Sequence, residues 1–136
     1  MLDLWRQILQ GSTRDLYRLL AELELSLTQL KLLHVLVESP TEISVKELGE
    51  ELGMSLPNAS RTVDALLQRG LVERREDEHD RRVKRVGATD KARDVIDRVD
   101  TARLQGLEAW AAELSPVQRR TLLDALLLLP KERPTP

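Results

Sequence analysis

The sequence contains no cysteine, and its aromatic residues are limited to Trp5, Tyr17 and Trp110. Without cysteine there can be no disulfide, no thiolate zinc ligand, no nucleophilic thiol and no cysteine-based redox sensor. Two histidines without cysteine also make a poor donor set for zinc. We therefore expect an aliphatic core, with no metal and no other cofactor.

Long apolar runs are missing as well. The longest runs from 125 to 129, far short of the roughly 18 residues that a membrane span requires. Asp3 and Arg6 stand where a signal peptide would be apolar. We expect a cytoplasmic protein that does not enter the membrane.

The features of an enzyme are also missing. There is no glycine-rich phosphate loop, no nucleophile with a spaced histidine partner and no cluster of metal ligands.

With 136 residues the chain has room for one domain, or for two lobes that share a core. Its net charge is −2, but residues 55–87 carry eight Lys/Arg against six Asp/Glu. This local excess supports nucleic-acid binding weakly.

Helix starts are marked by serines followed three residues later by Gln or Glu, a spacing that satisfies two backbone N–H groups. This pattern occurs at Ser26, Ser44 and Ser115. We predict a helix after each of them, the first ending before Pro40 and the third opening with Pro116.

Two further helices are predicted towards the ends of the chain. Apolar residues recur at helical spacing over 4–23, although Gly11 interrupts them, and Thr89 can cap a long helix running towards Leu114. These two helices and the helix after Ser115 have more leucine-rich surface than a small lobe can cover. The surplus favours a second copy of the chain as partner; the alternative is a terminal region that folds back into a monomeric core.

The middle of the chain predicts two helices joined by a glycine turn. Gly53 supplies a left-handed helix end, Ser55 caps the next helix, Pro57 lies in its first turn, and Gly70 ends it. Gly49 would allow the two helices to approach closely. This is the outline of a helix-turn-helix.

A short hairpin follows it. Residues 71–74 and 83–86 read as strands, and the intervening residues 75–82 lack any apolar side chain. So polar a loop projects into solvent or onto a polyanion. We interpret it as a wing.

The sequence resembles the MarR (multiple antibiotic resistance) family of regulators. The wing's Asp-x-Arg, a few residues after a Gly-Leu-Val-x-Arg strand, is the most specific element. The order of elements agrees over the whole length. The motifs that carry the resemblance are LGEELGMS (48–55), SRTVDAL (60–66), RGLVER (69–74) and Asp80-Arg81-Arg82 followed by Thr89.

The resemblance implies a mainly α fold with a small β-wing, a winged helix-turn-helix whose N- and C-terminal helices form a dimerisation region. It implies a transcriptional repressor that binds double-stranded DNA as a homodimer on a pseudo-palindromic operator, with recognition helices roughly 34 Å apart. A small-molecule effector, not identified by the sequence, would release it. The expected regions are 1–25 and 89–130 for dimerisation, 26–88 for DNA binding and 131–136 as a disordered tail.

The second helix of the motif would read the DNA. Asn58 can pair with an adenine edge and Arg61 with guanine. Ser55 and Ser60 would contact phosphates beside the helix N-terminus. The alternative for Arg61 is a solvated arginine paired with Asp64. The residues expected at the interface are Ser55, Pro57, Asn58, Ser60 and Arg61.

For the wing, the resemblance implies that Arg82 enters the minor groove and that Asp80 orients it and braces the loop. Arg81, Lys84 and Arg85 could reach phosphates. Read alone, the segment is equally a solvated hairpin tip.

Three residues depart from the family pattern. Arg85 and Ala88 stand where larger apolar residues are expected, which predicts a short or loosely packed wing. Leu56 stands where a polar DNA-facing residue is frequent, which predicts few contacts with base edges.

His34 could face an effector cleft, although a lone histidine is more often packed or at the surface. The acidic balance keeps a second hypothesis open: a winged-helix protein-interaction module that has lost DNA binding.

Overall fold

The computed structural model describes residues 2–129, so the predicted tail, 131–136, lies outside the described residues. None of the helices in this range is long and apolar enough to cross a membrane. In chain order the elements are α1 (Leu2–Glu22), α2 (Leu27–Glu38), β1 (Ile43–Ser44), α3 (Val45–Leu52), α4 (Leu56–Gln68), β2 (Val72–Glu76), β3 (Lys84–Ala88), α5 (Asp90–Ala112) and α6 (Pro116–Leu127).

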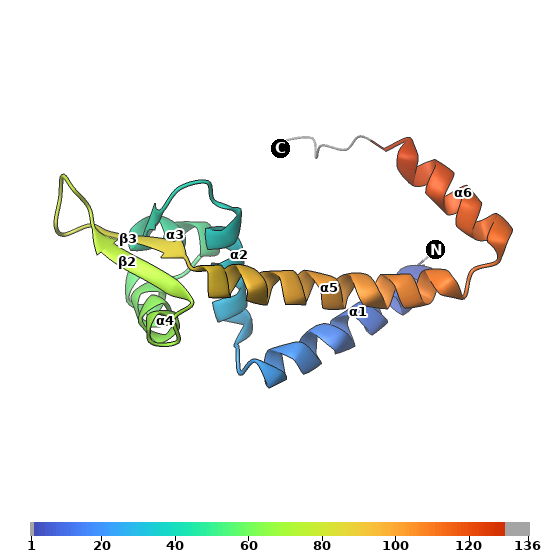
Figure 1. Ribbon diagram of the computed structural model, residues 1–136, viewed down its shortest axis with the longest axis horizontal. Coiled ribbons are helices and arrows are strands. Elements are labelled where there is room, and N and C mark those ends of the chain that lie inside the picture. Colours follow the sequence, from blue (N-terminus) through green and yellow to red (C-terminus); the bar gives the residue numbers. More distant parts are fainter. Residues whose placement is uncertain (1, 130–136) are drawn as a thin grey trace.

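The molecule has a lobe and an arm (Figure 1). Helices α2, α3 and α4 and the sheet form the lobe at one end, and α5 leaves it as a long rod along which α1 packs. Helix α6 follows a tight turn at the far end of α5. The arm therefore carries both terminal helical segments away from the lobe.

The predicted helix caps are all confirmed. Reciprocal capping boxes join Ser26 with Gln29, Ser44 with Glu47 and Ser115 with Gln118. At the start of α3 the Ser44 Oγ accepts from the Glu47 N–H at 3.1 Å, and the Glu47 carboxylate accepts from the Ser44 N–H at 2.9 Å. These i to i+3 contacts depend on local sequence only, which is why the helix starts could be predicted.

The turn between α3 and α4 follows the glycine pattern. Gly53 adopts a left-handed conformation with φ of 65° and ends α3. A Cβ at Gly49 would lie 3.1 Å from the Met54 carbonyl oxygen and 3.4 Å from the Ala59 Cβ. The predicted close approach of the two helices is confirmed.

The core of the lobe is aliphatic, as predicted. Its most enclosed side chains come from α2, α3, α4, the sheet and the first half of α5. Trp5 and Tyr17 are instead largely exposed. The fully buried large side chains are Leu32, Leu33, Leu48, Val63, Leu66, Leu71, Val72, Val86 and Val99.

The wing belongs to a three-stranded antiparallel sheet of order β1-β3-β2 (Figure 1). Strand β1 was not predicted; it pairs Ile43 with Val86. The expectation of a short or loosely packed wing is wrong. Strands β2 and β3 pair over five residues, Val86 is fully buried, and Ala88 packs against the core.

One set of contacts joins the lobe to the turn after α1, and a close approach of two helices holds α1 against α5. The Arg69 guanidinium, at the end of α4, donates to the carbonyl oxygens of Leu23 at 2.5 Å and Glu24 at 2.8 Å, in the turn between α1 and α2. Farther along the arm, a Cβ at Gly106 of α5 would lie 3.0 Å from the Ser12 backbone nitrogen. Helix α1 is unbroken despite Gly11.

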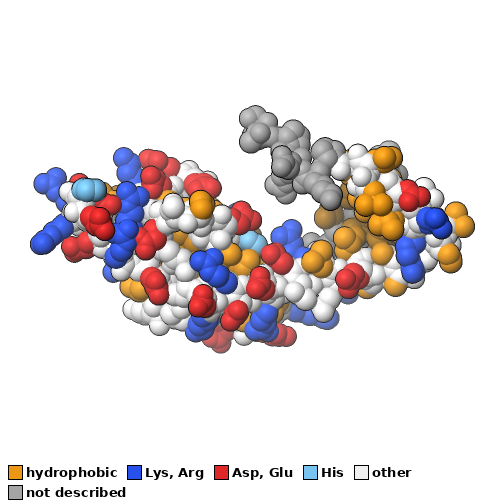
Figure 2. All heavy atoms as spheres, turned by 45° about the horizontal axis from the view of Figure 1, so that its top comes forward, with side chains coloured by type: hydrophobic (Ala, Val, Ile, Leu, Met, Phe, Trp, Pro, Cys, Tyr) orange, Lys and Arg blue, Asp and Glu red, His pale blue; other side chains and the backbone are white. Residues whose placement is uncertain are grey.

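The arm leaves a large apolar surface uncovered. Helix α6 buries none of its side chains, and Figure 2 shows hydrophobic side chains gathered over it at the end opposite the wing. Within the single chain, α6 therefore does not fold back onto the core. Large exposed apolar residues of the arm are Leu2, Trp5, Leu9, Tyr17, Leu104, Leu107, Val117, Leu123, Leu126, Leu127, Leu128 and Leu129.

Candidate nucleic-acid interface

The N-terminal half of α4 presents its polar residues to solvent. Ser55 caps the helix by accepting from the Asn58 N–H at 3.4 Å, and Pro57 lies in the first turn. Ser55, Pro57, Asn58 and Arg61 are exposed, whereas Ser60 is half-buried. The exposure expected of a reading helix is therefore present at four of its five predicted residues.

The two predicted base readers contact each other. The Arg61 guanidinium donates to the Asn58 side-chain oxygen. Asp64 pairs instead with Arg74 of β2, so the alternative pairing of Arg61 with Asp64 is wrong. This contact holds the two side chains together on the exposed N-terminal half of α4.

A groove of about 360 Å³ lies between this helix and the wing. It brings Ser60 of α4 together with Arg82 and Lys84 of the wing, three of the predicted residues. It also includes Lys46 and Arg74, which were not predicted. The remaining lining residues are Ser44, Val45, Leu56 and Val83.

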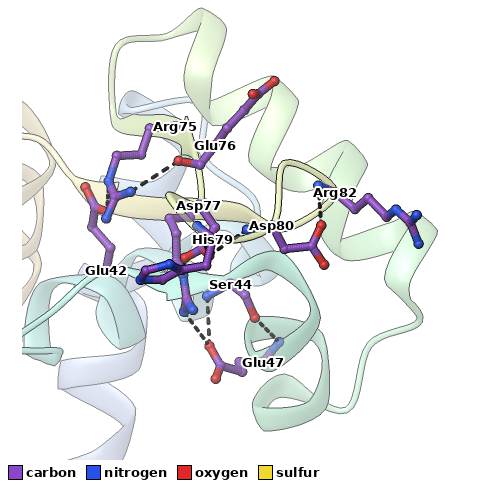
Figure 3. Close-up of polar contacts among 10 residues, drawn as sticks. Glu42, Ser44, Glu47, Arg75, Glu76, Asp77, His79, Asp80 and Arg82 are labelled. Atoms are coloured by element: carbon purple, nitrogen blue, oxygen red, sulfur yellow. Dashed lines mark hydrogen bonds and ion pairs between the residues drawn. The ribbon is translucent and has the colours of Figure 1, made fainter.

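Carboxylates organise the wing loop, residues 77–83. The Asp77 carboxylate accepts from the backbone N–H groups of His79 at 3.1 Å and Asp80 at 3.2 Å, and the Asp80 carboxylate accepts from the Arg82 N–H at 3.0 Å. Asp80 thus braces the loop through the backbone of Arg82. In Figure 3 the Arg82 side chain extends away from the loop.

Most of the other wing cations are paired within the protein. Arg75 pairs with Glu42, Lys84 lies 2.9 Å from Glu76, and the Arg85 guanidinium contacts both Asp77 and Glu47. Arg85 thus has an internal role in the folded chain, and a contact of Arg85 with phosphates stays a prediction. Arg81 and Arg82 are exposed at the tip, and Figure 2 shows Lys and Arg side chains gathered at this end.

Two carboxyl groups of this network have lowered pKa values. The pKa of Glu47 is lowered by its hydrogen bonds with Ser44 and then by the charge of Arg85. The pKa of Asp77 is lowered first by its hydrogen bond from Arg85 and then by the N–H of His79. Both groups are therefore stabilised as carboxylates in the folded protein.

These shifts predict an acid-sensitive wing. A carboxyl with a lower pKa in the folded state contributes stability above its unfolded pKa, which is lost as the pH falls through the folded pKa. The amide resonances of His79 and Asp80 should therefore titrate with a midpoint below about 3.9, the ordinary aspartate value. Asp77→Asn should remove this transition from NMR spectra recorded against pH. A midpoint at or above the ordinary value would contradict the network.

No group of three or more His, Asp or Glu side chains in the described range is arranged to hold a metal. The cationic groove and exposed helix instead fit a polyanion. The chain is similar to known proteins over most of its length. The wild-type apo MarR of E. coli is 25% identical, with a TM-score of 0.65 and 96% of each chain covered. A sequence model described as the MarR family matches residues 23–83.

Residues 23–83 thus match the MarR family model, and the fold over most of the chain is that of solved MarR structures. MarR proteins are winged helix-turn-helix, DNA-binding transcriptional regulators rather than enzymes. Two other structures share the MarR fold at a TM-score of 0.79. A mutant of S. aureus MepR bound to an oligodeoxyribonucleotide is 18% identical, with 91% of each chain covered. The regulator Tm0710 from Thermotoga maritima is 23% identical, with 90% of this chain and 86% of that chain covered.

Proposed function

We propose that this protein is a MarR-family regulator that represses transcription as a homodimer on a pseudo-palindromic operator. Each α4 would enter a major groove, and the wing's Arg82 would enter the neighbouring minor groove. The observation that carries the proposal is the groove between α4 and the wing, which places Ser60, Arg82 and Lys84 around one concave surface. A phosphate backbone passing through this groove would meet cations on both sides.

The dimer is supported by the uncovered surface of the arm. Residues 1–25 and 89–130 are proposed as the dimerisation region, because the described parts of α1, α5 and α6 expose large apolar side chains that water would otherwise contact. Residues 26–88 are proposed as the DNA-binding region. A symmetric pair would present two copies of α4 to one face of a duplex.

The proposed contacts differ in kind. Asn58 and Arg61 would contact base edges, Ser55 and Ser60 phosphates, and Pro57 would shape the first turn of α4. On the wing, Asp80 would hold the loop for Arg82, while Arg81, Lys84 and the newly found Lys46 and Arg74 would contact the backbone. Release by a small-molecule effector, which the resemblance to the MarR family implies, completes the proposal.

Arginine truncations test the interface. Arg61→Ala and Arg82→Ala should each weaken binding to DNA from the regulator's own promoter about 10- to 100-fold, because each removes a charged contact to base or groove. Fluorescence anisotropy over a series of salt concentrations should also show a shallower salt dependence. Lys31→Ala is the control, since this exposed cation of α2 lies outside both the groove and the arm.

If Arg61→Ala and Arg82→Ala both leave the DNA affinity unchanged, the proposed contacts of these two residues are contradicted. If the unmodified protein binds no DNA even at low salt, the second hypothesis, a protein-interaction module, takes its place.

A further inference from the structure

Arg85 lies where the wing loop meets the helix-turn-helix. It is the second residue of β3, opposite Arg75 of β2. Its Nε is 3.0 Å from the Asp77 Oδ1, and its Nη1 is 3.4 Å from the Glu47 Oε2. The side chain is 31% exposed. One guanidinium thus joins a carboxylate of the loop to a carboxylate of α3.

Both carboxylates already organise the backbone around them. The Glu47 Oε2 that faces Arg85 also accepts from the Ser44 N–H at 2.9 Å, at the start of α3 (Figure 3). Asp77 accepts from two loop N–H groups. Arg85 therefore connects the segment that shapes the wing tip to the cap of a helix that packs directly on α4.

Strand pairing of β2 with β3 ends at Glu76 and Lys84, and one further backbone hydrogen bond, from the Asp77 N–H to the Val83 carbonyl at 2.9 Å, closes the loop that carries Arg82. These backbone contacts lie within the hairpin and do not tie its tip to α3 or α4. A hairpin tip anchored only at its base would swing relative to α4, and DNA binding would have to remove that freedom. Contacts that order the tip beforehand reduce this entropic cost.

We propose that Arg85 is a positioning residue for DNA readout, holding the wing so that Arg82 stands at a fixed offset from α4. This inference rests on the proposed function. It assigns an intramolecular role to a residue that differs from the apolar residue expected at this position. The two ion pairs tie this part of the wing to α3.

Glu47→Gln separates the ion pair from the helix cap. The chain itself uses glutamine at the same cap position in the boxes of Ser26 and Ser115, so the amide oxygen of the substituted side chain should still accept from the Ser44 N–H. The change removes only the charge that faces Arg85. Arg85→Met removes both ion pairs while keeping a long side chain. Lys31→Met is the control, an exposed cation of α2 that lies outside both the groove and the arm.

The experiment is a double-mutant cycle on operator affinity. Each wing variant is measured in the presence of Arg82 and again with Arg82→Ala. We expect Glu47→Gln and Arg85→Met to weaken binding roughly three- to tenfold when Arg82 is present. With Arg82→Ala both losses should disappear, because the positioned group is gone. Thermal melting of each variant reports whether the fold is intact.

The sign of the Glu47→Gln effect is decisive. If Arg85 contacted phosphate directly, removing a nearby negative charge would tighten DNA binding, whereas positioning predicts weaker binding. Equal losses in both Arg82 backgrounds, tighter binding, or no change in either variant would overturn the inference alone. Failure of the unmodified protein to bind any operator would overturn the proposed function, and the inference with it.

Discussion

Replacing Leu123 and Leu126 of α6 with glutamate should convert the protein into monomers and lower its operator affinity more than about a hundredfold. Both side chains are roughly half exposed in the single chain, at 55% and 54%, and lie on a helix that buries none of its residues. In the proposed dimer they would be covered by the partner, where a carboxylate would lose its hydration without gaining a counter-ion. A monomer presents one reading helix, so the second half-site no longer adds to affinity.

Light scattering gives the oligomeric state, and anisotropy with the full operator and with one half-site gives the affinities. Thr121→Glu is the control, because helical geometry places residue 121 on the opposite side of α6 from Leu123 and Leu126. A glutamate variant that stays dimeric would exclude this face of α6 from the interface.

Two glycines of the arm should respond to alanine with opposite signs. At Gly106 a Cβ would lie 3.0 Å from the Ser12 nitrogen and 3.1 Å from its Cα, and backbone atoms cannot rotate out of the way as a side chain can. Helices α1 and α5 would have to separate, at a cost of about 1–3 kcal/mol. The gain in helix propensity, about 1 kcal/mol, offsets part of this.

At Gly11 a Cβ meets nothing within 4 Å among the described residues, so only the propensity gain applies. Gly11→Ala should raise the free energy of unfolding by up to about 1 kcal/mol, while Gly106→Ala lowers it and Gly106→Val lowers it further. Urea unfolding followed by circular dichroism measures all three. Stabilisation by Gly106→Ala would show that the two helices do not cross as closely as described.

Much of the fold could be predicted because its signals are local. A serine and a Gln or Glu three residues later decide a helix start wherever they occur, and Gly53 decides a helix end by itself. Strand β1 has only two residues, so it shows no periodicity, and its partner Val86 lies 43 residues further along the chain. The Gly106 crossing likewise depends on a helix nearly a hundred residues earlier.

The candidate interface divides in the same way. The exposure of Asn58 and Arg61 follows from the helical period, and it agrees with the prediction. The internal role of Arg85 could not be predicted in this way, because its partner Glu47 lies in α3, 38 residues earlier in the chain. Lys46 and Arg74 were missed for a related reason: only the folded sheet brings them beside Arg82.

Arg69 gives the regulator a thermodynamic property as well as a contact. Its hydrogen bonds to the Leu23 and Glu24 carbonyls join the last turn of the reading helix to the turn that follows α1. In the proposed dimer, a change in the orientation of α4 would therefore also change the packing of the arm, and the reverse. An operator with differently spaced half-sites would strain the subunit interface. By reciprocity, DNA of the correct spacing must strengthen dimerisation by the same factor that dimerisation strengthens DNA binding.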